Sequence, residues 1–139
     1  MVRITSADDA PELARLNHEF NGVDEPYQQL ALRLADPRRV DQALLTEVDG
    51  RAVGFAGLRV VPCVFYKEPY AELTELYVQL DHRRRGVGRM LAEKALELAR
   101  QAGAGHMLML VGRDNQTAGL FYKSLGFIDD DAAMCIRLR

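Results

Sequence analysis

The sequence contains no tryptophan, two cysteines and three histidines, and it has no long hydrophobic run. Cys63 and Cys135 are too few for a disulfide framework, and the scattered histidines lack metal-ligand spacing, so no metal is expected. No apolar segment has the length of a membrane-spanning helix, and residues 1–10 lack the apolar core of a signal peptide. These absences predict a reduced cytoplasmic protein with no membrane partner.

The chain also lacks an excess of positive charge, because its formal net charge is −2 at pH 7. General nucleic-acid-binding proteins are usually basic overall, so no nucleic-acid partner is expected. Hydrophobic residues make up 48% of the 139 residues, which is a globular composition. Without a visible repeat or linker, this length predicts one domain over residues 1–139.

Hydrophobic periodicity and turn residues predict an α+β fold with a mixed, mostly antiparallel sheet. A central βαβ unit of strand 70–80, helix 86–102 and strand 106–111 supplies one parallel pair. The remaining predicted elements are strand 2–5, a helix ending at Asn21-Gly22, helix 26–36, a hairpin over 42–61 that turns at Asp49-Gly50, a loop over 62–69, a helix over 115–125, and closing strands at 126–128 and 133–139.

The βαβ unit places a basic, glycine-containing stretch, "RRRGVGR" (83–89), between its first strand and its helix. A helix N-terminus offers unpaired backbone N–H groups and a favourable dipole to an anion. Gly86 and Gly88 remove side chains where phosphate oxygens would approach the backbone. The stretch matches neither the P-loop nor the dinucleotide fingerprint. It therefore predicts a pyrophosphate site, with a solvated basic helix start as the alternative.

Two motifs in chain order resemble those of the GNAT family of N-acetyltransferases. Residues 83–88, "RRRGVG", fit the family's acyl-CoA signature Q/R-x-x-G-x-G/A, and "DNQTAGLFYKSLGF" (114–127) is similar to its later segment. The order of the predicted elements also resembles that of the family over nearly the whole chain. The resemblance implies a single GNAT-like domain with strands splayed around an acyl-CoA, and acetyl-CoA as the donor co-substrate.

The resemblance also implies where the donor binds. Backbone groups of strand 70–80 would pair with the pantetheine arm, and an N–H near Leu76 would stabilise the oxyanion that forms at the thioester carbonyl. The N–H groups of residues 85–89 would hold the pyrophosphate. Asn115 resembles a pantetheine contact, although Asn is also a favoured helix N-cap. The implied cofactor-binding residues are Leu76, Tyr77, Val78, Arg83, Arg84, Arg85, Gly86, Val87, Gly88, Arg89, Asn115 and Phe121.

Tyr122 and a glutamate are the catalytic candidates. Tyr122 matches the family's tyrosine, whose phenol would donate a proton to the leaving thiolate; the alternative is a core tyrosine packed with neighbouring apolar side chains. Glu72 aligns with the base of histone-type family members, and Glu75 follows on the same strand. On a regular strand these two glutamates point to opposite faces, unless a bulge intervenes. A water chain is the third route to deprotonation of the acceptor.

The acceptor is expected to be a primary amine that contacts the variable segments 18–40 and 62–70. Glu25, Tyr27 and Glu75 are the candidate substrate-binding residues, since carboxylates suit a cationic acceptor such as an aminoglycoside, a polyamine or a protein amine. The predicted function is acetyl transfer from acetyl-CoA by direct attack in a ternary complex. A non-catalytic acyl-CoA-binding sensor is the alternative, and the sequence leaves monomer or homodimer open.

Overall fold

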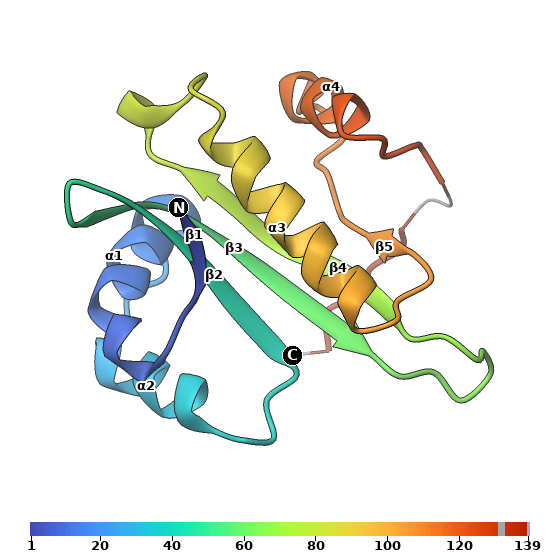
Figure 1. Ribbon diagram of the computed structural model, residues 1–139, viewed down its shortest axis with the longest axis horizontal. Coiled ribbons are helices and arrows are strands. Elements are labelled where there is room, and N and C mark those ends of the chain that lie inside the picture. Colours follow the sequence, from blue (N-terminus) through green and yellow to red (C-terminus); the bar gives the residue numbers. More distant parts are fainter. Residues whose placement is uncertain (131–132, 139) are drawn as a thin grey trace. The chain divides into compact units, whose positions relative to one another are not determined.

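The structure, a computed structural model, describes residues 1–130 and 133–138 and confirms the α+β class (Figure 1). The chain divides into two compact units, Met1–Leu108 and Met109–Arg139, and each is described by itself. None of the described helices is long and apolar enough to cross a membrane. In chain order the elements are β1 (Val2–Ile4), a 3-10 turn (Ala7–Asp9), α1 (Ala10–Asn21), α2 (Tyr27–Ala35), β2 (Asp41–Val48), β3 (Arg51–Val61), β4 (Tyr70–Val78), a second 3-10 turn (Leu80–His82), α3 (Val87–Gln101), β5 (Met107–Leu108) and α4 (Gln116–Ser124).

The sheet of the first unit has the strand order β1-β2-β3-β4-β5. Neighbouring strands from β1 to β4 are antiparallel, whereas β5 is parallel to β4. The sequence predicts this mixed, mostly antiparallel sheet, including the parallel pair on either side of α3 in the chain. The observed β5 is shorter than the strand predicted over 106–111.

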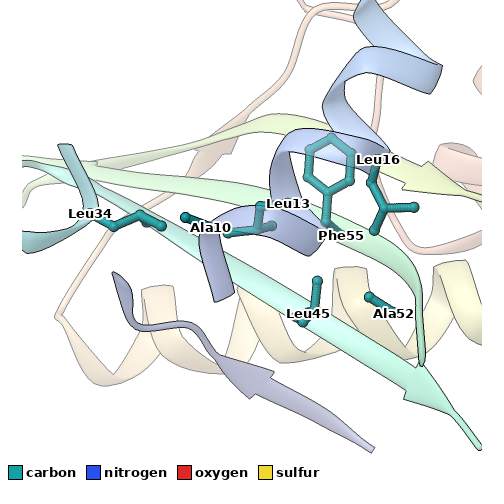
Figure 2. Close-up of a cluster of buried hydrophobic side chains, with 7 residues drawn as sticks. All are labelled: Ala10, Leu13, Leu16, Leu34, Leu45, Ala52 and Phe55. Atoms are coloured by element: carbon teal, nitrogen blue, oxygen red, sulfur yellow. The ribbon is translucent and has the colours of Figure 1, made fainter. Parts of the chain in front are cut away.

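Helices cover both faces of this sheet (Figure 1). On one face α1 and α2 pack against β2 and β3 through a buried apolar core (Figure 2). On the opposite face, Gly54 of β3 lets α3 approach, because a Cβ at Gly54 would lie 3.2 Å from Leu91 Cδ1. The core under α1 and α2 comprises Ala10, Leu13, Leu16, Leu34, Leu45, Ala52 and Phe55. The buried residues of α3 are Leu91, Ala92, Ala95 and Ala99.

Short sequence signals end and join these elements as predicted. The Ser6 N–H donates to Asp9 Oδ2 at 2.9 Å before α1. Gly22 ends α1 in the left-handed region, with a φ of 68°. Asp49 and Gly50 have φ values of 52° and 77°, which is the pattern of a type I′ hairpin turn. The hairpin of β2 and β3 therefore turns where the sequence predicts.

Two bulges interrupt the antiparallel ladders. In β3, Val53 is an extra residue opposite the step between residues 46 and 47. In β4, Thr74 is an extra residue opposite the step between residues 57 and 58. Gly57 makes room for the second bulge, because a Cβ at Gly57 would overlap the Thr74 hydroxyl. Each bulge reverses which face the following residues of its strand point to.

The second unit contains α4, close to the helix predicted over 115–125, but the predicted closing strands are wrong. Residues 126–130 and 133–138 form no strand, and Arg139 lies outside the described residues. Gly126 and Phe127 instead end α4, because their N–H groups donate to the carbonyls of Lys123 and Tyr122 in a Schellman motif. The second predicted strand has no backbone partner within the described residues, and Met134 is 99% exposed.

Candidate functional site

The basic stretch after β4 forms a tight turn that leads into α3. Arg84 and Gly86 are both left-handed, with φ values of 62° and 80°. The Met90 N–H donates to Gly86 O at 3.0 Å, which opens the helix ladder. As at every helix start, the preceding N–H groups, including those of Val87 and Gly88, have no intrahelical acceptor. The turn can therefore offer backbone donors and the helix dipole to an anion.

The arginines of this turn differ in their surroundings. Arg83 Nε donates to Val78 O at 2.8 Å, and the Arg83 guanidinium lies 5.8 Å from the centre of the Tyr77 ring. Arg83 is therefore held against β4. Residues 84–85 are exposed, and Arg89 on the first turn of α3 lies 3.5 Å from a glutamate one turn later. Positive charge thus surrounds the helix start, but Arg83 is already engaged by the strand.

The predicted pantetheine strand runs past its parallel neighbour. The last paired residues of β4 and β5 are Glu72 and Leu108. β4 continues for residues 73–78, whose edge on that side has no β5 partner among the described residues. This free edge includes backbone groups of Leu76 and Tyr77, and an extended ligand could pair with it.

The Tyr77 side chain lies on the α1 side of β4, away from α3. Its hydroxyl donates to Glu19 Oε2 at 3.1 Å, and its ring stacks on Phe20 with centroids 4.9 Å apart. Burial, together with the Glu19 carboxylate, raises the pKa of Tyr77. Burial would raise the pKa of Glu19 as well, but hydrogen bonds from Gln79 and Tyr77 outweigh it and lower that pKa. The Tyr77 side chain is thus tied to α1.

Glu72 and Glu75 lie on the same face of β4, which corrects the expectation of opposite faces. Glu72 pairs with Arg59 and Glu75 with Gly57, and these two partners are alternate residues of β3. The physical reason is the bulge at Thr74, which adds one residue between the two glutamates. Both carboxylates therefore face the layer that contains α1 and α2.

A groove of about 710 Å³ lies between this face of the sheet and the two helices. Glu75 lines the groove and accepts from Asn21 Nδ2 at 3.2 Å. Glu72 is not among the lining residues; its Oε2 lies 3.6 Å from Arg59 Nη1. The lining residues are Leu13, Asn17, Leu30, Arg33, Leu34, Asp36, Arg39, Val40, Asp41, Gln42, Ala43, Phe55, Ala56, Gly57, Arg59, Thr74 and Glu75.

The other two predicted acceptor residues do not line the groove. Glu25 forms an ion pair with Arg33, which does line it, so the Glu25 carboxylate is already neutralised. Tyr27 is the first residue of α2 and is 46% exposed. Of the three predicted acceptor residues, only Glu75 is placed in the groove.

Sequence reasoning missed five charged residues of the groove: Arg33, Asp36, Arg39, Asp41 and Arg59. Asp41 and Arg59 are opposite each other on β2 and β3, and Arg59 Nε lies 2.6 Å from Asp41 Oδ1. A cross-strand pair of opposite charges at the open end of the hairpin was a usable signal. Among the described residues, no group of three or more His, Cys, Asp or Glu could hold a metal ion.

The second unit holds Asn115, Phe121 and Tyr122. Asn115 Oδ1 accepts from the Ala118 N–H at 3.1 Å, so Asn115 caps α4. The Tyr122 ring lies edge-to-face with Phe121 and Phe127, at centroid distances of 5.1 and 5.8 Å. Burial raises the pKa of the Tyr122 phenol. This phenol therefore keeps its proton at neutral pH.

Comparison with known sequences identifies relatives along most of the chain. The model of the Acetyltransferase (GNAT) family matches residues 8–127. An uncharacterized N-acetyltransferase of Methanocaldococcus jannaschii is 37% identical over 91% of this chain and 59% of its own length. A mycothiol acetyltransferase of Rhodococcus jostii is 31% identical over 86% of this chain and 42% of its own length. The chain thus spans less than two thirds of the length of these curated relatives.

Solved structures share the fold along the whole chain. A putative acetyltransferase from Agrobacterium tumefaciens aligns with a TM-score of 0.87 at 27% identity and covers 99% of both chains. An aminoglycoside acetyltransferase from a soil metagenome, solved with sisomicin, aligns with a TM-score of 0.85 over 100% of this chain and 96% of that chain. At 17% identity, this second likeness shows the fold alone.

Proposed function

The chain belongs to the GNAT acetyltransferase family, and we propose that it transfers an acetyl group from acetyl-CoA to a primary amine in a ternary complex. The observation that carries the proposal is the start of α3, where the left-handed Gly86 leads from the signature turn into a helix. The family match over residues 8–127 crosses both structural units, which supports one acetyltransferase domain over 1–139.

The donor lies along the edge of β4 with its pyrophosphate at the helix start. The backbone N–H groups of residues 85–89 bind the phosphate oxygens, and Gly88 leaves room for them. Residues 76–78 pair with the pantetheine arm through backbone groups. On α4, Asn115 uses its side-chain oxygen as a helix cap, so its amide nitrogen is the group that donates to the arm. Phe121 adds an apolar contact.

The reaction removes two protons from the acceptor ammonium and supplies one to the leaving thiolate. A carboxylate takes the proton of the acceptor ammonium, and the free amine attacks the thioester carbon. The oxyanion is stabilised by an N–H near Leu76. As the C–S bond breaks, the Tyr122 phenol gives its proton to the leaving thiolate, and the attacking nitrogen loses its second proton, which returns to the phenolate through solvent. Glu75, which lines the groove, is the favoured base, and Glu72 is the second candidate.

The acceptor is an amine, the class of substrate named for several relatives. One relative is named as a mycothiol acetyltransferase, and one solved structure holds the aminoglycoside sisomicin. A sensor that binds acetyl-CoA without turnover is the alternative function. Release of free CoA thiol in the presence of an amine panel separates the two, because a sensor releases none.

The donor site is tested by the substitution Gly88→Glu. A carboxylate at the helix start repels the pyrophosphate and fills its space, so calorimetry is expected to show loss of acetyl-CoA binding. Ala102→Glu adds the same side chain at the exposed far end of α3 and is expected to leave the affinity unchanged. Circular dichroism verifies that both variants are folded. A folded Gly88→Glu protein with wild-type affinity would remove the basis of the proposed donor site.

A further inference from the structure

Most charged side chains of the groove form ion pairs within the protein. Arg33 is paired with Glu25, and Arg59 with Asp41 at 2.6 Å. The Asp36 carboxylate is held by a third arginine outside the groove at 3.0 Å. These ion pairs cancel within the protein, so they give a ligand little net attraction.

One cation and one carboxylate of the groove remain outside these pairs. Arg39 Nη1 donates to the backbone oxygen of Asp36 at 3.3 Å, and its charge helps Arg38 to lower the pKa of the Asp36 carboxylate. No carboxylate of the described residues lies within ion-pair distance of Arg39. Glu75 accepts from the neutral amide of Asn21, and no cation of the described residues forms an ion pair with Glu75. The groove therefore offers one positive and one negative group to a ligand.

Apolar side chains also line the groove. Leu13 and Leu34 come from the helices, and Phe55 comes from the floor of the sheet (Figure 2). Leu30 and Val40 extend the same apolar lining. A ligand in the groove thus meets apolar surface as well as the two charged groups, which favours an apolar body over a polycation.

The sheet register sets the spacing between the charged groups. Glu75 pairs with Gly57, and Gly57 pairs with Ala43, so two strand spacings separate Glu75 from β2. Two spacings are about 10 Å across the sheet, and Arg39 lies four residues before Ala43, which adds up to about 13 Å along the strand direction. The backbones of Glu75 and Arg39 are therefore roughly 10–16 Å apart, and three extended residues of a peptide span about 10 Å. An amino acid, whose amine and carboxylate are adjacent, is too short to reach both groups.

We propose that the acceptor is a zwitterionic amine with an apolar body, whose amine lies at Glu75 and whose carboxylate lies at Arg39. This proposal rests on the acetyl transfer proposed above and names the substrate class. An α-amine, with an ordinary pKa of about 8, also loses its proton near neutral pH more readily than a lysine side chain does. A short apolar peptide with free termini has this chemistry.

The experiment uses the tripeptide alanyl-leucyl-alanine with a free C-terminal carboxylate and the same tripeptide as its C-terminal amide. Binding to the full chain is measured by calorimetry, and turnover by CoA release from acetyl-CoA. The free acid is expected to bind on the order of 10-fold more tightly than the amide, because a charge-assisted hydrogen bond to Arg39 is lost in the amide. Spermidine serves as the polycation probe and is expected to bind more weakly than the free acid.

Arg39→Gln is the test variant, and Arg38→Gln is its matched control. Arg38 is the neighbouring arginine, is paired with Asp36, and does not line the groove. Arg39→Gln should remove the preference for the free acid and leave binding of the amide unchanged. Arg38→Gln should keep the preference of the wild type.

The two readouts separate this inference from the proposed function. The zwitterionic acceptor is overturned by equal binding of acid and amide, by equal effects of the two arginine variants, or by stronger binding of spermidine. In each of these cases, CoA release with any amine still supports acetyl transfer. An Arg39-dependent preference without any CoA release supports the acceptor site and overturns the transfer reaction.

Discussion

The Tyr122 phenol combines a protonated state with an apolar setting. Its ring packs with Phe121 and Phe127, and burial raises its pKa. A thiolate with an ordinary pKa of about 8.5 accepts a hydrogen bond or a proton from such a phenol more readily than from water. The same packing would also suit a purely structural tyrosine, so kinetics must separate the two roles.

Tyr122→Phe keeps the ring and removes the hydroxyl. We expect kcat to fall by roughly 10²–10⁴-fold with little change in the affinity for acetyl-CoA, because proton donation acts on the transition state. Steady-state kinetics and calorimetry measure the two quantities. Tyr66→Phe makes the same change at an exposed loop position and should behave as the wild type. Wild-type turnover in Tyr122→Phe would leave this residue with a packing role.

The two glutamates of β4 lie on the same face of the strand but differ in the groups that they contact. Glu75 contacts a neutral amide in the groove, whereas Glu72 faces the Arg59 guanidinium. A base must exchange a proton with the acceptor, and the groove position of Glu75 allows this. We therefore expect Glu75→Gln to depress kcat/KM most strongly at low pH. The deficit should shrink as the pH approaches the pKa of the amine, about 8 for an α-amine.

Glu72→Gln makes the same change on the same face and serves as the control. Its effect should be independent of pH, because it alters an ion pair and removes no proton acceptor from the groove. The measurement is kcat/KM against pH with one accepted amine for the wild type and both variants. A pH-dependent rescue confined to Glu72→Gln would assign the base to Glu72 instead.

At the scale of elements, β3 and β4 show what the sequence predicts and what it leaves out. The turn at Asp49-Gly50 was predicted from residue types alone, and it would pair Asp41 with Leu58 if the ladder were regular. The bulge at Val53 shifts this register, so Asp41 pairs with Arg59. The residues that line the groove depend on this shift, which periodicity does not reveal.

Glycines inside β3 were the signal for these irregularities. A glycine in the interior of a strand often marks a bulge or a close backbone approach. Gly57 lies against the bulged Thr74, and Gly54 lies under α3. The turn before α3 could be predicted because its glycines belong to a recognisable motif. The direction in which Glu72 and Glu75 point could not be predicted, because it depends on one extra residue in the strand.

The ends of helices explain the other difference between sequence and structure. The apolar residues of "GFI" suggest a strand, but Gly126 has a φ of 101° and closes α4. A left-handed glycine after a helix is a common C-terminal signal. Local capping therefore outweighs the strand pattern at 126–128. Residues 133–138 are mostly apolar, but no hydrogen-bonded neighbour within the described residues makes them a strand.

At the scale of the whole molecule, several carboxylates tie the first unit together and should make its stability depend on pH. Asp9 accepts two hydrogen bonds from Arg3, at 2.7 and 2.9 Å, and these bonds lower the pKa of Asp9. The Arg15 side chain lowers the pKa of Glu12, which also accepts from the Ala52 N–H at 3.1 Å. Glu12 thus connects α1 to β3.

The sign of the pH dependence follows from these lowered values. The folded pKa values lie below the unfolded ones, which are about 3.9 for Asp and 4.3 for Glu. The unfolded chain therefore binds more protons in this range, and the stabilisation is complete above the unfolded pKa values. It is lost as the pH falls through the folded ones. We expect the urea midpoint to stay nearly constant between about pH 7 and pH 5 and to fall steeply below about pH 4.

Asp9→Asn tests this expectation at one site, with Asp8→Asn as its control. Asp9→Asn should lower the free energy of unfolding by about 1–2 kcal/mol at pH 7, since hydrogen bonds to a charged group are lost. It should also flatten the decline below about pH 4, because one proton-binding difference is gone. Asp8 is exposed and has no ion-pair partner among the described residues, so Asp8→Asn should follow the wild-type curve. If Asp9→Asn declined as steeply as the wild type between about pH 5 and pH 3, the Arg3–Asp9 pair would not be a source of acid sensitivity.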